Sequence, residues 1–374
     1  MAGGERRSSA QRGLVILVSA EQQAAVPIVS IIVPCYNEQA TIGLLLEAIR
    51  CQTCTAAALE VVIADGVSSD ATRQRIADYQ AAHPELAIHV VDNPQRHIPA
   101  GLNRAIQAAR GEYLVRLDAH SVPHPDYVTR CLADLQSGKG DNVGGVWEIR
   151  PFAAHGGSPS LSARAIAAAA ANPFGVGDAL YRFTHQAQAV DTVPFGAFSR
   201  RVIERIGAYD ESLLSNEDYE FNTRLRQSGG TVWLDPAIRS VYFARPDLGA
   251  LARQYARYGY WKVRMLERYP HSLRWRQALP PVFVISLVGL AVLSLLSTFI
   301  PSLVLAPRLL ALEVAAYALI LFVASLKPAF IQREPLLACV VPLAIAVMHI
   351  AWGSAFLWSA ARIWSARLWR HQSS

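Results

Sequence analysis

The sequence predicts an α/β protein with a Rossmann-like, mostly parallel sheet, followed by a C-terminal α-helical membrane region. From about residue 27 to residue 245, short runs of Val, Ile and Leu alternate with helical patterns and polar turns. This alternation is typical of a parallel sheet covered by helices on both faces. Nearly all long apolar runs lie after Leu279, and the hydrophobic content is 52% against 17% charged residues. The chain of 374 residues is therefore expected to contain two parts.

Residues 1–26 precede the first expected strand, and we expect them to form a disordered tail. The apolar run from Leu14 to Val18 is too short for the core of a signal peptide. The following domain is therefore expected to stay in the cytoplasm. Cys51 and Cys54 form a lone CxxC without a second pair or a nearby histidine, so packing is favoured over a zinc or redox site.

Residues 27–245 are expected to form one domain. Its first four strands lie in "IVSIIVPCYNE", "LEVVIADG", "LAIHVVDN" and "EYLVRLDAH", with a helical pattern between each pair. Ligands of parallel sheets bind at the carboxyl ends of the strands. Polar side chains gather there: Asn37, Glu38, Asp65, Asp92, Asn93, Asp118 and His120.

The second half of this domain is less regular. "DNVGGVWEI" predicts a strand, and the alanine-rich "SARAIAAAAANPFGVGDALY" predicts a short helix followed by a glycine-containing loop of the kind that orders over an active site. "VDTVPFGAFSRRVIERIGAYDESL" predicts strand, turn and helix, and "SNEDYEFNTRLRQSGG" a helix capped by Ser215 or Asn216. Two short strands, "TVWLD" and "IRSVYF", are expected to close the domain.

Residues 246–278 are expected to hold a basic amphipathic helix and a linker. On a helical wheel over Asp247 to Arg268, four arginines (Arg253, Arg257, Arg264 and Arg268) fall within about 60° of arc. Leu248, Leu251, Tyr255, Tyr258 and Met265 gather on the opposite side. Such a helix can lie in a membrane interface, and this excess of positive charge favours an anionic membrane surface over nucleic acid.

Residues 279–374 contain three hydrophobic segments: Val282–Ile300, Leu309–Leu326 and Pro335–Ala361. Each approaches or exceeds the roughly 20 apolar residues that a bilayer span needs. The alternative is a hydrophobic helical subdomain. Three spans would place the arginines after the third segment outside the cytoplasm, against the positive-inside rule. Either that segment is re-entrant or interfacial, or the charge rule is overridden.

Acidic residues at strand ends either form turns and caps or contact ligands. Asp70 opens a helix, and the two interpretations are equally supported there. Asp65 directly follows the second strand and precedes Gly66, and we expect it to contact a ligand.

Taken alone, Asp118-Ala119-His120 is better explained as a turn acid beside a hydrogen-bonded surface histidine. Together with the other acids it suits a nucleoside diphosphate bound with a divalent cation. A hard cation prefers carboxylate and phosphate oxygens, and imidazole is a better ligand for Mn²⁺ than for Mg²⁺. Glu217 and Asp218 start a helix, where acids are favoured by the helix dipole. Two adjacent acids can also bind substrate hydroxyls and accept the proton of an attacking hydroxyl.

Together these segments resemble the successive motifs of the family 2 inverting glycosyltransferases of the GT-A fold. The resemblance runs from about Ser30 to Tyr242 and is carried by "VSIIVPCYNE", "VVIADGVSSDAT", "AGLNRAIQAARGEYLVRLDAH", "GAFSRRVIERIGAYDESL" and "NEDYEFNTRLRQSGGTVWLDP". The Asp-Ala-His variant and the following "ARQYARYGYWKVR" are most similar to the bacterial membrane-anchored glucosyltransferases of succinoglycan-type exopolysaccharide assembly.

The resemblance implies a role for each candidate residue. The residues that would frame the nucleotide are Pro34, Tyr36, Glu38 and Asp65, with Asp65 at the base. Asp118 would meet the ribose or diphosphate, and His120 would take the metal-ligand position usually held by a second aspartate. Asp218 would be the general base, and Glu217 would help to hold the acceptor or the sugar.

Relatives that polymerise chains carry Gln-X-X-Arg-Trp on the helix that follows this domain. Gln254-Tyr-Ala-Arg257-Tyr258 is similar but ends in tyrosine. Gln254 and Arg257 would therefore lie on the donor side, with Arg257 near a pyrophosphate, and transfer of a single sugar is expected rather than processive synthesis.

The resemblance thus implies a metal-dependent hexosyltransferase, with Mn²⁺ favoured over Mg²⁺. UDP-glucose is the first donor expected, and the acceptor would be a lipid-linked, polyprenyl-diphosphate saccharide of exopolysaccharide or cell-surface glycan assembly. The enzyme would be a multi-pass protein of the bacterial inner membrane, with its catalytic domain facing the cytoplasm. The alternatives are a polyprenyl-phosphate sugar synthase, whose acceptor oxyanion needs no general base, and a non-catalytic membrane scaffold with a nucleotide pocket.

Overall fold

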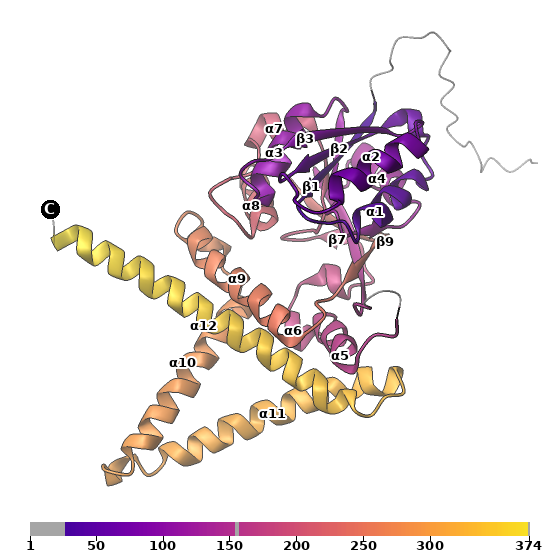
Figure 1. Ribbon diagram of the computed structural model, residues 1–374. Coiled ribbons are helices and arrows are strands. Elements are labelled where there is room, and N and C mark those ends of the chain that lie inside the picture. Colours follow the sequence, from indigo (N-terminus) through magenta and orange to yellow (C-terminus); the bar gives the residue numbers. More distant parts are fainter. Residues whose placement is uncertain (1–26, 154–156, 373–374) are drawn as a thin grey trace, which may run out of the picture.

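A mixed, mostly parallel sheet forms the centre of the N-terminal domain in the computed structural model, which describes residues 27–153 and 157–372 (Figure 1). The predicted disordered tail lies outside the described residues. The strand order is β3-β2-β1-β4-β8-β6-β9-β5, and β7 pairs with β9. The first four strands are parallel, as the sequence predicts: β1 (Val29–Cys35), β2 (Leu59–Asp65), β3 (Ala87–Asp92) and β4 (Tyr113–Arg116).

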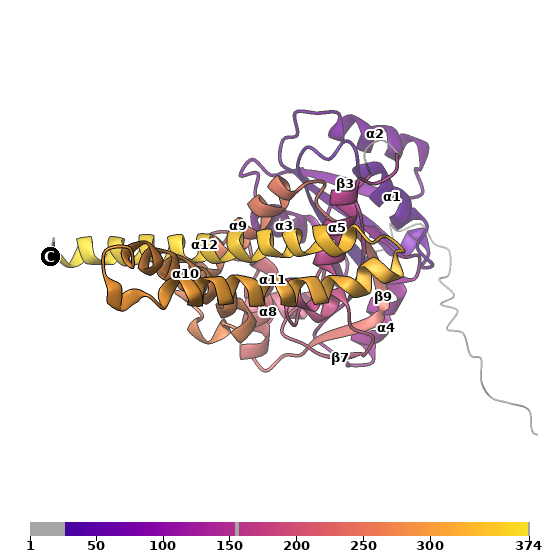
Figure 2. The same cartoon turned by 90° about the horizontal axis from the view of Figure 1, so that it is seen from below.

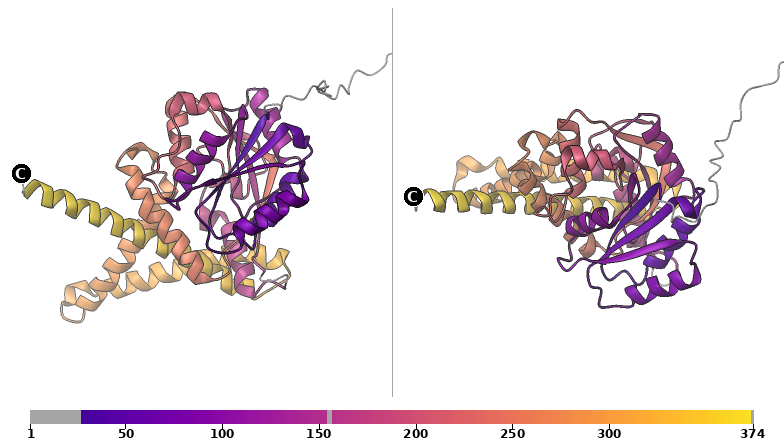
Figure 3. Two further views of the ribbon diagram at one scale, coloured as in Figure 1. Left: turned by 45° about the horizontal axis from the view of Figure 1, so that its top comes forward. Right: turned by 90° about the horizontal axis from the view of Figure 1, so that it is seen from above.

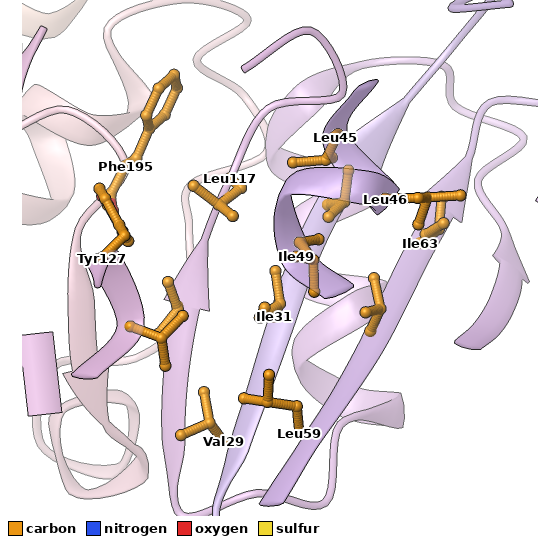
Figure 4. Packing of buried hydrophobic residues seen from close by; sticks show 14 of the residues in the cluster. Val29, Ile31, Leu45, Leu46, Ile49, Leu59, Ile63, Leu117, Tyr127 and Phe195 are labelled. Atoms are coloured by element: carbon orange, nitrogen blue, oxygen red, sulfur yellow. The ribbon is translucent and has the colours of Figure 1, made fainter. Parts of the chain in front are cut away.

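Helices cover both faces of this sheet, as predicted. They are α1 (Ile42–Arg50), α2 (Thr72–Ala82), α3 (Ile98–Ala108), α4 (Tyr127–Gln136), α7 (Arg200–Ile206) and α8 (Glu217–Gln227). One buried cluster joins α1 and α4 to the sheet through Leu45, Ile49 and Tyr127 (Figure 4). The other joins α3 and α8 to the opposite face through Leu102 and Phe221.

The second half of the sheet is mixed in direction. The remaining strands are β5 (Val122–Pro123), β6 (Asn142–Arg150), β7 (Gln188–Ala189), β8 (Ala197–Ser199) and β9 (Val232–Phe243). β8 is antiparallel to β4 and β6, whereas β9 is parallel to β6. The prediction of two short closing strands is wrong, because β9 is continuous. Pro236 cannot donate to a sheet ladder, and the register between β6 and β9 shifts between Gly144 and Val146 to accommodate this region.

The alanine-rich segment forms α5 (Leu161–Ala170) and a short helix, α6 (Pro173–Val176). The short helix predicted there is confirmed, but part of the expected loop is helical and lies against the C-terminal helices. Asn172 donates from Nδ2 to the carbonyl oxygen of Ala324 at 2.9 Å, and Arg164 pairs with Glu334 at 2.7 Å.

Four long helices follow: α9 (Leu248–Leu266), α10 (Trp275–Leu296), α11 (Ala306–Ile331) and α12 (Leu337–Gln372). α9 matches the predicted amphipathic helix, with Arg253 and Arg257 exposed and Leu251, Tyr255 and Met265 buried. Within the described residues, the helical segments at Trp275–Leu296, Pro301–Ile331 and Leu337–Ala366 are long and apolar enough to cross a membrane. α10 begins earlier than predicted and runs through Pro280 and Pro281.

The C-terminal helices extend away from the sheet domain (Figures 2 and 3). α12 also packs along α9, where a Cβ on Gly259 would collide with the carbonyl oxygen of Trp352. A third buried cluster therefore combines Tyr242 and Leu251 of the N-terminal part with Val341, Ile345 and Met348 of α12.

Candidate active site

The carboxyl ends of the parallel strands and the first turn of α8 meet at one buried arginine. Arg116 is the last residue of β4 and is 2% exposed. Its Nη2 lies 3.2 Å from Oδ1 of Asp118 and 3.0 Å from Oε1 of Glu217, and its Nη1 forms an ion pair with Asp218. The structure therefore brings together Asp118, Glu217 and Asp218, which lie far apart in the sequence.

Burial alone would lower the pKa of the Arg116 guanidinium, but the negative charges of Asp118 and Glu217 outweigh it and raise that pKa. Arg116 is therefore charged at any pH at which the fold exists. A buried charge of this kind is tolerated only when it is paired and hydrogen-bonded.

Asn216 occupies the N-cap position of α8 in a left-handed conformation, with φ of 66°. The sequence predicts a cap at Ser215 or Asn216, and Asn216 does occupy the N-cap position. Its side chain makes no capping hydrogen bond, because Nδ2 donates to the carbonyl oxygen of Tyr258 at 3.2 Å. The catalytic candidates on α8 are thereby tied to α9. Glu217 is nearly buried, whereas the side chain of Asp218 is 32% exposed.

Asp65 is fully buried at the end of β2. Its carboxylate accepts from the backbone N–H of Ser68 at 3.0 Å, from Oγ of Ser68 and from Nε of Arg73. Arg73 also pairs with Asp92 at the end of β3. Asp65 thus organises the turn at this edge of the sheet, and Asp70 likewise accepts from the backbone N–H of Thr72 at the start of α2.

Pro34, near the end of β1, and Tyr36, directly after it, lie at the same edge of the sheet. Tyr36 is 41% exposed, and the guanidinium of Arg96 lies 5.5 Å from its ring centroid. Gly66 allows this packing, because a Cβ there would lie 2.9 Å from the Tyr36 ring. An exposed aromatic ring beside a cation offers a stacking surface for a base.

Gln254 is buried on α9 and donates from Nε2 to the hydroxyl oxygens of Tyr242 and Tyr258 at 3.1 and 2.9 Å. Arg257, one turn further, is exposed and forms no ion pair with another described residue. The structure therefore places Gln254 in a packed network that also reaches Asn216, and leaves Arg257 outside the carboxylate cluster.

Asp118 and His120 carry the side-chain atoms that would hold a divalent cation, and in this structure the Asp118 carboxylate is paired with Arg116. His120 Nδ1 lies 3.0 Å from Oε1 of Glu38, so a proton on Nδ1 leaves Nε2 available as a ligand. Burial tends to lower the pKa of His120, but the Glu38 hydrogen bond and the charge of Asp118 raise it overall. The described residues contain no group of three His, Cys, Asp or Glu side chains placed to hold a metal by themselves. Further ligands would have to come from a substrate or from water.

Comparison with known proteins adds to this geometry. A model of the family described as "Glycosyl transferase family 2" matches residues 30–207. A succinoglycan biosynthesis protein, ExoA of Rhizobium meliloti (strain 1021), is 30% identical over 252 residues, which cover 67% of this chain and 73% of the relative. The chain belongs to glycosyltransferase family 2.

Two further glycosyltransferases are similar over most of their length. The dolichyl N-acetyl-α-D-glucosaminyl phosphate 3-β-D-2,3-diacetamido-2,3-dideoxy-β-D-glucuronosyltransferase of Methanococcus voltae is 25% identical, with 72% of this chain and 82% of the relative covered. The mannosyltransferase PcManGT of Pyrobaculum calidifontis, solved with GDP-Man and Mn²⁺, superposes with a TM-score of 0.56 at 22% identity, covering 89% of this chain and 87% of that chain. This structural likeness confirms the GT-A fold.

Sequence reasoning on this family 2 chain missed Arg116 and Arg73. Arg116 stands in the apolar stretch "YLVRLDAH", and an arginine inside a run that otherwise predicts a buried strand is a signal for a paired buried charge. Arg73 carried no such signal, because it lies on a helix with many polar residues.

Proposed function

We propose that this glycosyltransferase moves a single glucose from UDP-glucose to a polyprenyl-diphosphate-linked saccharide in exopolysaccharide or cell-surface glycan assembly. The observation that carries the proposal is the convergence of Asp118, Glu217 and Asp218 on Arg116. This convergence places Asp118, which follows strand β4, beside Glu217 and Asp218 in the first turn of α8. The names of the relatives support the pathway and the lipid-linked acceptor, since one is a succinoglycan biosynthesis protein and another is named for a dolichyl-phosphate-linked sugar.

In the proposed reaction Asp218 accepts the proton of the acceptor hydroxyl as that oxygen attacks the anomeric carbon. The bond between this carbon and the oxygen of the nucleoside diphosphate breaks on the opposite side, so the configuration inverts. Asp218 suits this role because its carboxylate is partly exposed at the site. Glu217 would hold a hydroxyl of the acceptor or the sugar, and Arg257 would approach the departing diphosphate from α9.

Asp118 and His120 would hold a divalent cation, and Glu38 would orient the imidazole. When bound, such a cation neutralises charge on the leaving diphosphate. We expect Mn²⁺ to be preferred over Mg²⁺, because Mg²⁺ binds nitrogen ligands poorly.

The proposed location is the inner membrane of a bacterium, with the catalytic domain on the cytoplasmic face. The three candidate spans and the exposed arginines of α9 support a multi-pass protein whose active site lies close to lipid. A polyprenyl-linked acceptor would meet the site at this surface.

The test is a panel of nucleotide sugars and synthetic polyprenyl-diphosphate saccharides, read as released nucleoside diphosphate and as glycosylated lipid. We expect Asp218→Asn to lower kcat by roughly 100-fold or more while UDP binding is kept. Asp126→Asn is the matched control, because Asp126 is an exposed acid paired with Arg130 on α4. If no sugar donor is used, the proposal fails. Normal turnover by Asp218→Asn would reject the base assignment and favour a lipid-phosphate acceptor, whose oxyanion needs no base.

A further inference from the structure

Arg116 links the two halves of the candidate site. Within the described residues it is the ion-pair partner of Asp118, of Glu217 and of Asp218, and none of these three carboxylates pairs with any other cation there. All three contacts are made by Nη1 and Nη2 of the planar Arg116 guanidinium. The last residue of β4 therefore sets the relative positions of the strand end and the first turn of α8.

Stability alone is a poor reason for such a residue. Buried ion pairs can often be replaced by apolar side chains of similar volume without loss of stability. The neighbouring residues of β4, Leu114 and Val115, are fully buried and apolar, so an apolar side chain at position 116 would suit the strand. The charge at this position therefore points to a role in the site.

The orientation of the Asp218 carboxylate depends on this contact. Asn216 turns its side chain to Tyr258, so it does not hold the first turn of α8 from the N-cap. The Asp218 side chain is partly exposed, and Arg116 is its ion-pair partner among the described residues. A general base that moves by about 1 Å can lose roughly 100-fold in rate.

We propose that Arg116 is a positioning residue that holds the Asp218 carboxylate in line with the acceptor hydroxyl and fixes Glu217 beside it. This inference rests on the proposed function, in which Asp218 is the base. Arg116 itself need not touch either substrate, since its effect passes through the carboxylates with which it pairs. Lysine cannot replace it fully, because an ammonium group lacks the planar fork that reaches several carboxylates at once.

The test compares Arg116→Lys and Arg116→Gln with Arg110→Gln. Arg110 is the matched control, because it also pairs with a buried carboxylate, that of Glu60 near the start of β2, at the opposite end of the strands. We expect kcat to fall by roughly 10- to 100-fold in Arg116→Lys and by more in Arg116→Gln. Millimolar guanidinium should restore part of the activity of Arg116→Gln. Arg110→Gln should keep the wild-type kcat and show no response to guanidinium.

A double-mutant cycle separates positioning from a general structural role. If Arg116 acts through Asp218, Arg116→Lys should cost little further activity in an Asp218→Asn background. Equal losses in both backgrounds, or a wild-type kcat in Arg116→Lys, would overturn the inference.

A second measurement does not depend on turnover. We expect backbone amide exchange at residues 220–223, whose N–H groups are the first to bond within α8, to be faster in Arg116→Gln than in the wild type, and unchanged in Arg110→Gln. An unchanged rate in Arg116→Gln would count against the positioning role even if the wild type transfers no sugar. Failure of the wild type with every donor would instead refute the proposed function.

Discussion

Lys262 is a buried amine between α8 and the start of the first candidate membrane helix, α10. It is 1% exposed, and its Nζ donates to the carbonyl oxygen of Ser272 at 3.1 Å. The same nitrogen lies 4.0 Å from the ring centroid of Tyr219, the residue that follows Asp218. Burial lowers the pKa of Lys262 from 10.5 to about 7, with Asp191 opposing the shift and nearby arginines adding to it.

This shift makes stability depend on pH in a defined direction. Between pH 7 and about 10.5 the folded protein has released a proton that the unfolded chain still holds, so the free energy of unfolding rises with pH. The slope approaches about 1.4 kcal/mol per pH unit, which gives a gain of about 2 kcal/mol between pH 7 and pH 9.

The assay is thermal unfolding of the purified protein in detergent between pH 7 and pH 9. We expect the wild type to gain about 2 to 3 °C in Tm over this range, and the pH profile of Lys262→Met to be flatter, with a higher Tm than the wild type at pH 7. Lys139→Met is the control, because Lys139 is half-exposed and paired with Asp134. It should follow the wild-type pH profile. The reasoning is refuted if Lys262→Met keeps the full wild-type rise.

Three further outcomes can be checked with single variants. His120→Asp should shift the metal preference from Mn²⁺ towards Mg²⁺, seen both in Mn²⁺ titrations followed by electron paramagnetic resonance and in transfer rates; an unchanged profile would argue against ligation by His120. Gly259→Leu should lower stability by about 2 kcal/mol or more, because its side chain meets the backbone of α12. Gly289→Leu, where no atom lies within 4 Å of the added Cβ, should be nearly neutral in the same unfolding assay. Gly66→Ala should displace Tyr36 and weaken UDP binding in calorimetry, whereas Gly43→Ala, which also has open space, should leave it unchanged.

The first four strands could be predicted because each is a continuous apolar run between helical patterns. β9 could not, because Pro236 reads as a break, and only the register shift opposite it shows how the strand continues. The acids at strand ends could also be predicted from the sequence, but their convergence on Arg116 could not. Arg116 joins residues about 100 positions apart, and no local pattern reports such a pairing.

Lys262 illustrates a different limit. Lys262 lies in a segment with an excess of positive charge, although on the helical wheel it falls among Leu251, Tyr255 and Tyr258. Its position on the wheel therefore predicts that Lys262 is buried, whereas its charge alone favours an exposed position. The domain boundaries near residues 245 and 278 remain predictions.

A buried cluster shared by the sheet domain and the C-terminal helices fixes the distance between the candidate site and the candidate membrane spans. Tyr242 and Leu251 pack in one cluster with Val341 and Ile345, so a water-soluble fragment ending before Trp275 would expose this cluster and tend to aggregate. With α10, α11 and α12 in a membrane, the Asp218 carboxylate keeps a constant elevation over the lipid headgroups. Under the proposed function, acceptors would then be selected by length. A lipid-linked saccharide that is too short or too long would place its hydroxyl below or above Asp218, the proposed base.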